Sequence, residues 1–244
     1  MPEHAGLRGE MDAGQSLSPG RWSRATWLVV WLGAGYSLLT ALLRQPGDAS
    51  RLWFLDLALM AVFVAGLVAR QRRAWWPGRP VSSRRRAALL FVAGSWLTGM
   101  LYELSLRTGA AGFGGMHPDT TTSFLLAQGF YVPLAVGGWL LARRFGYSAE
   151  TVFWTGALAS LYELITVGVP AVLGQPSFLL LAPLLAGYYL TVYGYFLALP
   201  LLFMDERCLW ASAPRPISRL QRAALGVALG LVCWAIFIGW AALL

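Results

Sequence analysis

The sequence contains no lysine, only two histidines and only two cysteines among its 244 residues. A chain without lysine cannot form the Schiff base that holds retinal in a microbial-rhodopsin-type photoreceptor. Cys208 and Cys233 lack the close spacing of a metal-binding pair, and no two histidines have the spacing of a metal or haem site. A Gly-rich phosphate-binding loop is also missing. We therefore predict neither a metal ion nor a cofactor.

Charged residues make up only 12% of the chain, whereas 57% of the residues are hydrophobic. Soluble domains carry about 25% charged residues, so the composition is that of a membrane protein. Seven apolar stretches are long enough to cross about 30 Å of hydrocarbon as helices, and they cover residues 26–43, 52–70, 87–106, 121–142, 150–172, 178–203 and 220–243. We predict an all-α, polytopic integral membrane protein, with a disordered cytoplasmic tail at 1–20 and one seven-helix domain at 21–244.

The distribution of arginine predicts how the chain is oriented in the membrane. All 19 basic residues are Arg, and one orientation leaves only Arg44, Arg51 and Arg107 outside the cytoplasm. The positive-inside rule then places the N-terminus in the cytoplasm and the C-terminus outside it. We interpret the Arg-rich loop at residues 70–86 as an orientation signal at the anionic headgroups, so no nucleic-acid partner is expected. We predict a multi-pass protein of a bacterial or archaeal plasma membrane.

Two segments of the chain share a series of short motifs. The tetrapeptide LYEL occurs at 101–104 and 161–164, SFLL follows at 123–126 and 177–180, and GFY at 129–131 corresponds to GYY at 187–189. This order predicts a parallel duplication of a two-helix hairpin, with helices three and four matching helices five and six. A Gly-xxx-Gly spacing at Gly226 and Gly230 favours close packing of the last helix.

Three carboxyl groups lie inside the predicted spans, at Asp56, Glu103 and Glu163. A charge at the bilayer centre costs at least about 2.5–3.5 kcal/mol, so these side chains are not expected to face lipid. We predict that they line an outward-facing polar pocket in the membrane. Glu163 and Glu103 are the candidate general acid/base residues, and His117, from the loop after the third span, is a third catalytic candidate. The candidate substrate-binding residues are Arg107, Asp119, Asp56, Tyr102 and Tyr162.

Each of these residues also has a purely structural interpretation. Glu103 and Arg107 have the i,i+4 spacing of a helical ion pair. His117 and Asp119 lie in a His-Pro-Asp sequence that can shape a turn. Asp56 can reach the membrane interface, and the tyrosines are more often packing residues than site residues. Glu163 has no basic residue within two turns in the sequence, which favours a functional role.

Two short stretches resemble known families. ELSLR at 103–107 resembles the Glu-x-x-x-Arg motif of intramembrane CAAX-type proteases, but Tyr102 stands beside Glu103 where that family pairs two glutamates, and His117 stands alone, so we reject this family. ELSLRTGAAGFGG at 103–115 is similar to a Glu…Thr-Gly…Phe-Gly stretch of membrane carotenoid hydratases. The similarity covers barely a dozen residues, and we do not assign the chain to that family.

Three functions fit the sequence. The first is a membrane enzyme that applies acid/base chemistry to a lipid-like substrate, such as an isoprenoid, from the outer leaflet. The second is a small-solute or proton-coupled transporter in which the duplicated glutamates titrate in turn. The third is a structural or interaction subunit whose polar groups fix helix packing. Membrane lipid is the one partner that all three share.

Overall fold

The structure is a computed structural model that describes residues 22–43, 53–71, 83–105, 117, 119–174, 176–210 and 214–244. Every regular element in these ranges is helical. The elements are α1 (Arg24–Leu43), α2 (Trp53–Gln71), α3 (Arg84–Ser105), α4 (Thr120–Phe145), α5 (Ala149–Ala159), α6 (Leu161–Glu163), η2 (Leu164–Gly168), α7 (Val169–Gly174), η3 (Pro176–Leu181), α8 (Ala182–Leu202), η4 (Glu206–Leu209) and α9 (Arg219–Ala241). The prediction of an all-α fold is confirmed, while the tail predicted at 1–20 lies outside the described residues.

Six helical segments are long and apolar enough to cross a membrane, namely Arg24–Leu43, Phe54–Gln71, Arg84–Ser105, Thr120–Phe145, Leu179–Leu202 and Arg219–Ala241. They correspond to six of the seven predicted spans. Large apolar side chains such as Leu28, Leu89 and Leu231 are exposed on their outer faces. A surface of this kind is stable only in contact with lipid or another apolar partner, so the chain is a membrane-embedded helical bundle.

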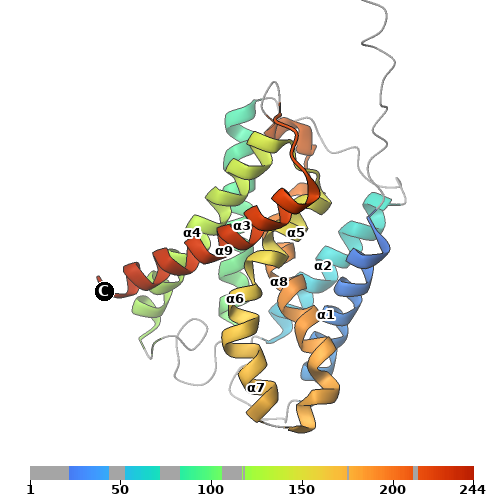
Figure 1. Cartoon of the computed structure of the whole chain (residues 1–244), viewed down its shortest axis with the longest axis vertical. Helices are drawn as coiled ribbons and strands as arrows, with labels where there is room; N and C mark the ends of the chain where they lie inside the picture. The colour runs from blue at the N-terminus through green and yellow to red at the C-terminus, as the bar shows by residue number, and fades with distance from the viewer. Residues whose placement is uncertain are drawn as a thin grey trace, which may run out of the picture.

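Helix α8 forms the centre of the bundle and packs against α1, α2, α3 and α5 (Figure 1). Its residues from Thr191 to Leu199 are all buried, so every face of the helix is covered there. An apolar helix without a polar face is expected at such a position. Helix α9 instead crosses the outside of α4 and α5 and leaves much of its surface exposed (Figure 1).

Helix α9 approaches α5 closely at two glycines. A Cβ atom on Gly230 would lie 2.3 Å from the backbone oxygen of Ala159, and one on Gly226 would lie 3.1 Å from the Cβ of Leu158. No larger residue fits at Gly230 without moving the backbone of α5. The close packing predicted from the Gly-xxx-Gly spacing is therefore confirmed.

The fifth predicted span, residues 150–172, is interrupted rather than one continuous helix. Helix α5 ends at Ala159, a turn at Ser160 follows, and the short α6 leads into the π-helical turn η2 and then α7. In η2 the N–H of Val169 bonds to the carbonyl of Leu164, five residues earlier. Pro170 has no N–H to continue an α-helical ladder and its ring would clash with the carbonyl four residues before it. The wider π turn accommodates this proline, and Glu163 stands directly before the turn.

Candidate functional site

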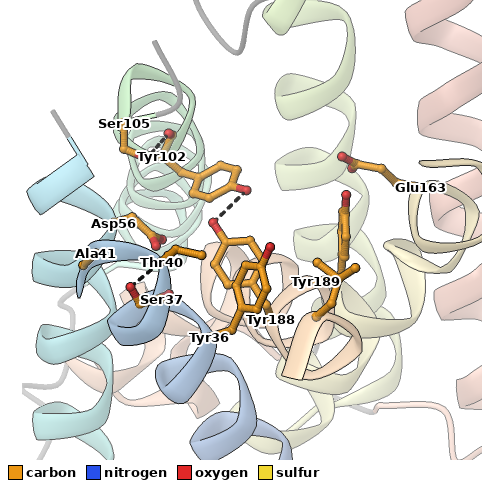
Figure 2. A pocket seen from close by; sticks show the side chains of 11 residues that line it. Tyr36, Ser37, Thr40, Ala41, Asp56, Tyr102, Ser105, Glu163, Tyr188 and Tyr189 are labelled. Atoms are coloured by element: carbon orange, nitrogen blue, oxygen red, sulfur yellow. Dashed lines mark hydrogen bonds between the residues drawn. The ribbon is translucent and has the colours of Figure 1, made fainter. Parts of the chain in front are cut away.

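A cavity of about 260 Å³ lies at one end of the bundle, between α1, α2, α3, α6 and α8 (Figure 2). Its wall is formed by the second half of α1, the first turn of α2, the last turn of α3 and the first half of α8. The lining residues are Tyr36, Ser37, Thr40, Ala41, Asp56, Tyr102, Ser105, Glu163, Leu185, Tyr188 and Tyr189. The arginine distribution predicts that this end of the bundle faces the outside of the cell.

Two carboxyl groups face the cavity from opposite sides. Figure 2 shows Asp56 on the wall formed with α1 and α3, and Glu163 on the wall across from it. Tyrosines stand between them: the Tyr188 hydroxyl donates to the Tyr102 hydroxyl at 3.1 Å, and the Tyr36 ring lies 4.8 Å from the Tyr188 ring. The Tyr189 hydroxyl points toward Glu163 (Figure 2). The cavity therefore combines acidic groups with phenols and aromatic faces.

Each of the carboxyls Asp56, Glu103 and Glu163 accepts a hydrogen bond from a buried tyrosine. Tyr195 donates to Asp56 at 3.4 Å, Tyr131 donates to Glu103, and Tyr193 donates to Glu163. The rings of all three tyrosines pack against Phe196, with centroids 5.2–5.4 Å away. One residue of α8 thus links the three phenol donors, so the carboxyls are held by a common aromatic cluster.

Glu103 lies behind the cavity wall. It is 5% exposed and does not line the cavity, although its neighbour Tyr102 does. Its Oε1 accepts from Tyr131, whereas its Oε2 is buried without a hydrogen-bond partner among the described residues. Glu103 is therefore a neighbour of the site, and Glu163 is the carboxyl that a ligand can reach.

The local backbone also distinguishes Glu163. It is the last residue of α6, and the π turn η2 begins at Leu164. π-helical turns inside α-helices occur frequently at functional sites. Because the helix is interrupted here, the Glu163 side chain is not confined to the lipid-facing face or the packed face of one continuous helix.

His117 and Asp119 lie together at the start of α4 and do not line the cavity. The Asp119 carboxylate accepts the backbone N–H of Thr122 at 2.6 Å, and the backbone N–H of Asp119 donates to Nδ1 of His117 at 3.1 Å. These bonds form a helix N-cap. The Thr122 N–H, with a smaller contribution from His117, lowers the pKa of Asp119. Their predicted catalytic and binding roles stay predictions.

Tyr162, another predicted binding residue, does not line the cavity. Tyr162 is half-buried and its ring packs against Trp234 of α9 at 5.0 Å, so it faces away from the cavity. Arg107 lies outside the described residues, and its predicted ion pair with Glu103 therefore stays a prediction. Asp56, Tyr102 and Glu163 are the predicted residues that the cavity brings together.

The two LYEL glutamates share one structural feature, a hydrogen bond from a tyrosine on the next long helix. Tyr131 stands eleven residues after Thr120, the first residue of α4, and Tyr193 stands eleven residues after Ala182, the first residue of α8. The motif comparison pairs Tyr131 with Tyr189 instead. The two pairings differ by four residues, and the second segment contains the π turn η2 and the 3-10 helix η3, which the first segment lacks in its described residues. The duplication itself stays a prediction.

Sequence reasoning did not identify the polar face of α1. Tyr36, Ser37 and Thr40 line the cavity, and the Ser37 hydroxyl is buried without a hydrogen-bond partner in the described part of the chain. Their i, i+1, i+4 spacing places them on one helix face, which is the pattern that could have indicated them. The tyrosines of α8 carried no comparable pattern, because the aromatic residues between 188 and 196 fall on several faces of the helix.

Within the described ranges, no group of three or more His, Cys, Asp and Glu side chains is arranged to hold a metal ion. Comparison with protein-family models, curated proteins and solved structures finds no match to this chain. The site is therefore interpreted from its own geometry.

Proposed function

We propose that the chain is a membrane enzyme that performs acid/base chemistry on a lipid-like substrate, such as an isoprenoid, entering from the outer leaflet. The observation that carries the proposal is the pair Asp56 and Glu163, which face each other across a phenol-lined cavity. Two carboxyls in one cavity can act as proton donor and proton acceptor in a single reaction.

The interior beneath the cavity supports an enzyme over a transporter. Below Asp56, the rings of Tyr195, Phe63, Phe153 and Trp22 contact one another in sequence, with centroids 5.6–5.8 Å apart. Tyr195, Phe63 and Phe153 are completely buried. This column of rings fills the bundle toward the opposite end and provides no polar path across it. A cavity closed at its base suits a substrate that enters and leaves on one side.

The surface beside the cavity supports a substrate that arrives through lipid. Leu38 and Leu42 on α1 are exposed next to the lining residues Ser37 and Ala41. Ile165, two residues after Glu163, is 63% exposed. Apolar surface therefore adjoins the cavity on the Asp56 side and on the Glu163 side, where an acyl or prenyl chain can rest while its reactive part reaches the carboxyls.

An isoprenoid double bond matches the chemistry of the cavity. In the proposed step, protonated Glu163 transfers its proton to one alkene carbon, and the positive charge develops on the adjacent carbon. The faces of Tyr36, Tyr188 and Tyr189 can stabilise that cation. The Asp56 carboxylate then accepts a proton from a carbon next to the cation, which shifts the double bond, or from a water that adds to it. Proton exchange with solvent restores both carboxyls.

Deuterium incorporation provides the test. The purified full-length protein, reconstituted in lipid nanodiscs in D₂O, is incubated with prenyl alcohols and polyenes, and mass spectrometry measures carbon-bound deuterium. We expect incorporation by the wild type and its loss in Glu163→Gln. Asp205→Asn is the matched control, because it changes a carboxyl to an amide in the connection before η4, outside the cavity lining. Equal incorporation in wild type and Glu163→Gln, or none into any substrate, would contradict the proposal.

A further inference from the structure

A second cavity, of about 470 Å³, lies at the opposite end of the bundle, where α1, α5 and α9 begin. Its lining residues are Ser23, Glu150, Thr151, Trp154, Thr155, Leu158, Arg219, Arg222 and Ala223. The arginine distribution predicts that this end faces the cytoplasm. None of these residues belongs to the site proposed above.

The close approach of α5 and α9 explains why the cavity forms. The two helices touch at Gly226 and Gly230, where Cβ atoms would meet Leu158 and Ala159. Toward the first turn of α9 the larger residues Arg219, Arg222 and Ala223 replace glycine along the same side, and the cavity opens there. Its base is the helix crossing, and its mouth is at the level of the helix N-termini.

The charges around this cavity favour an anion. Arg219 and Arg222 stand one turn apart on α9, and neither forms an ion pair within the described part of the chain. The Nε of Arg222 is buried and has no hydrogen-bond partner there. Because the buried Nε is closed to a ligand, an anion would bind at the two terminal nitrogens of Arg222, which are not buried and have no hydrogen-bond partner in the described ranges.

The single carboxyl in the lining is already bound by α1. Oε1 of Glu150 accepts from the Ser23 backbone N–H at 2.8 Å and from the Thr26 hydroxyl at 2.6 Å. Thr26 in turn accepts from Nε1 of Trp154 at 2.9 Å. This network ties Oε1 of Glu150 to Ser23 and Thr26, and the two arginines outnumber this one carboxyl in the cavity lining.

We propose that this cavity binds the phosphate of an anionic phospholipid from the leaflet at this end of the bundle. Arg219 and Arg222 would hold the phosphate, since guanidinium groups bind phosphate oxygens in a bidentate manner. Trp154, Leu158 and Ala223 provide an apolar wall along which an acyl chain can lie. A soluble phosphate ester shares the headgroup chemistry but gains nothing from that wall. This site does not depend on the reaction proposed for the other cavity.

Native mass spectrometry of the detergent-solubilised full-length protein tests the site. Phosphatidylglycerol is titrated against phosphatidylcholine, and glycerol 3-phosphate is titrated separately. We expect the wild type to retain one phosphatidylglycerol in preference to phosphatidylcholine, and Arg222→Gln and Arg219→Gln to weaken retention by about tenfold, the loss expected for one charge-assisted hydrogen bond. Arg85→Gln is the matched control, because Arg85 is exposed in the first turn of α3 at the same end of the bundle.

A second variant covers the case in which an arginine variant fails to fold. Ala223→Trp keeps both arginines and fills the space between α5 and α9, so it should reduce lipid retention while the protein stays helical. Binding of glycerol 3-phosphate as tight as that of the lipid would assign the same phosphate site to a soluble ester. Retention of phosphatidylcholine equal to that of phosphatidylglycerol, or equal losses in Arg85→Gln and Arg222→Gln, would overturn the proposal.

Discussion

Glu103 and Glu163 have the same neighbours in sequence but different surroundings in the bundle. Both belong to an LYEL tetrapeptide, and both accept a hydrogen bond from a tyrosine of the following long helix. Glu103 lies in the continuous helix α3 and is 5% exposed, with one oxygen buried and unpaired in the described structure. Glu163 lies at an interruption of its helix and lines a cavity.

The difference between the two glutamates lies downstream of the shared motif. The second copy is followed by the π turn η2 and Pro170, whereas α3 continues as a regular helix through Glu103 to Ser105. The wider turn changes where the side chains around Glu163 point. The same carboxyl–phenol pairing can therefore be a buried structural pair at Glu103 and an accessible acid at Glu163.

The largest expected effect is on catalysis. Glu163→Gln should reduce deuterium incorporation by about 10²–10⁴-fold, the usual contribution of a general acid or base. Gln can still accept the Tyr193 hydroxyl, so the Tm should stay within about 2 °C of the wild type. Glu103→Gln should reduce incorporation by less than about tenfold, since Glu103 does not line the cavity. A larger loss in Glu103→Gln than in Glu163→Gln would reverse the assignment of roles.

The second expected effect is on stability, and here the Glu103 pair should matter more than the Glu163 pair. Tyr131→Phe removes the hydrogen bond to Glu103 and leaves both oxygens of a buried carboxyl unpaired, which costs about 1–3 kcal/mol. For a chain of this size the Tm should fall by about 2–12 °C. Tyr193→Phe should lower the Tm less, because Glu163 lines a cavity and can find water or the Tyr189 hydroxyl.

Thermal unfolding of both phenylalanine variants in the same detergent, followed by circular dichroism, measures this difference. The wild type, Glu103→Gln, Tyr131→Phe and the double variant with both changes form a double-mutant cycle for the Tyr131–Glu103 hydrogen bond. A larger fall in Tm for Tyr193→Phe than for Tyr131→Phe would contradict this prediction.

The third effect tests the π turn. Pro170→Ala restores a backbone N–H and lets an α-helical ladder continue through 166–170, which should turn Glu163 away from the cavity. We expect incorporation to fall by about tenfold, short of the hundredfold that a misplacement of 1 Å can cost. Helicity should be kept or increased.

Pro133→Ala is the matched control for Pro170→Ala. Pro133 lies inside α4 and is not followed or preceded by a π turn in that helix. It should leave incorporation near the wild-type level. If both proline variants lose activity equally, the loss reflects general loosening of the helices, and the π turn has no special role.

The spans and the main carboxyls could be predicted from the sequence because lipid imposes simple constraints. Long charge-free runs must be helices, and Asp56 and Glu163 must avoid lipid, so both were expected at a common polar site. The structure brings them together with Tyr102 in one cavity. The close packing at Gly226 and Gly230 follows from the same kind of local reasoning.

The remaining parts of the site depend on packing between distant segments. Tyr36 and Ser37 reach the cavity only because α1 packs on α8, and Phe196 links three tyrosines only because α8 is central. Neither contact has a signature in a single sequence. The π turn was missed because Pro170 indicates an interruption but not its form. The second cavity was missed because Glu150 and Arg222 look like ordinary interface charges.

The smallest expected effect tests whether Asp119, in the loop before α4, belongs to the cavity site or only caps the helix. The Thr122 N–H lowers the pKa of Asp119, so the folded state favours the ionised carboxyl. The N-cap therefore stabilises the protein above the unfolded carboxyl pKa, and this contribution disappears as the pH falls through the lower, folded pKa. Asp119→Ala should lower the Tm slightly at neutral pH, with a difference from the wild type that shrinks in acid.

Asp119→Asn separates a cap from a binding residue. Asparagine caps helices about as well as aspartate and does not titrate, so this variant should match the wild-type Tm at neutral pH and lose the pH dependence of the cap. Thermal unfolding of the three proteins from neutral to acidic pH measures the stability effect, and the deuterium assay is run on the same samples. A strong loss of incorporation in Asp119→Asn with an unchanged Tm would mean that the loop takes part in the site, as the sequence predicted. A normal rate would leave His117 and Asp119 as the structural start of α4, and the chemistry would then be confined to the cavity that Asp56 and Glu163 share.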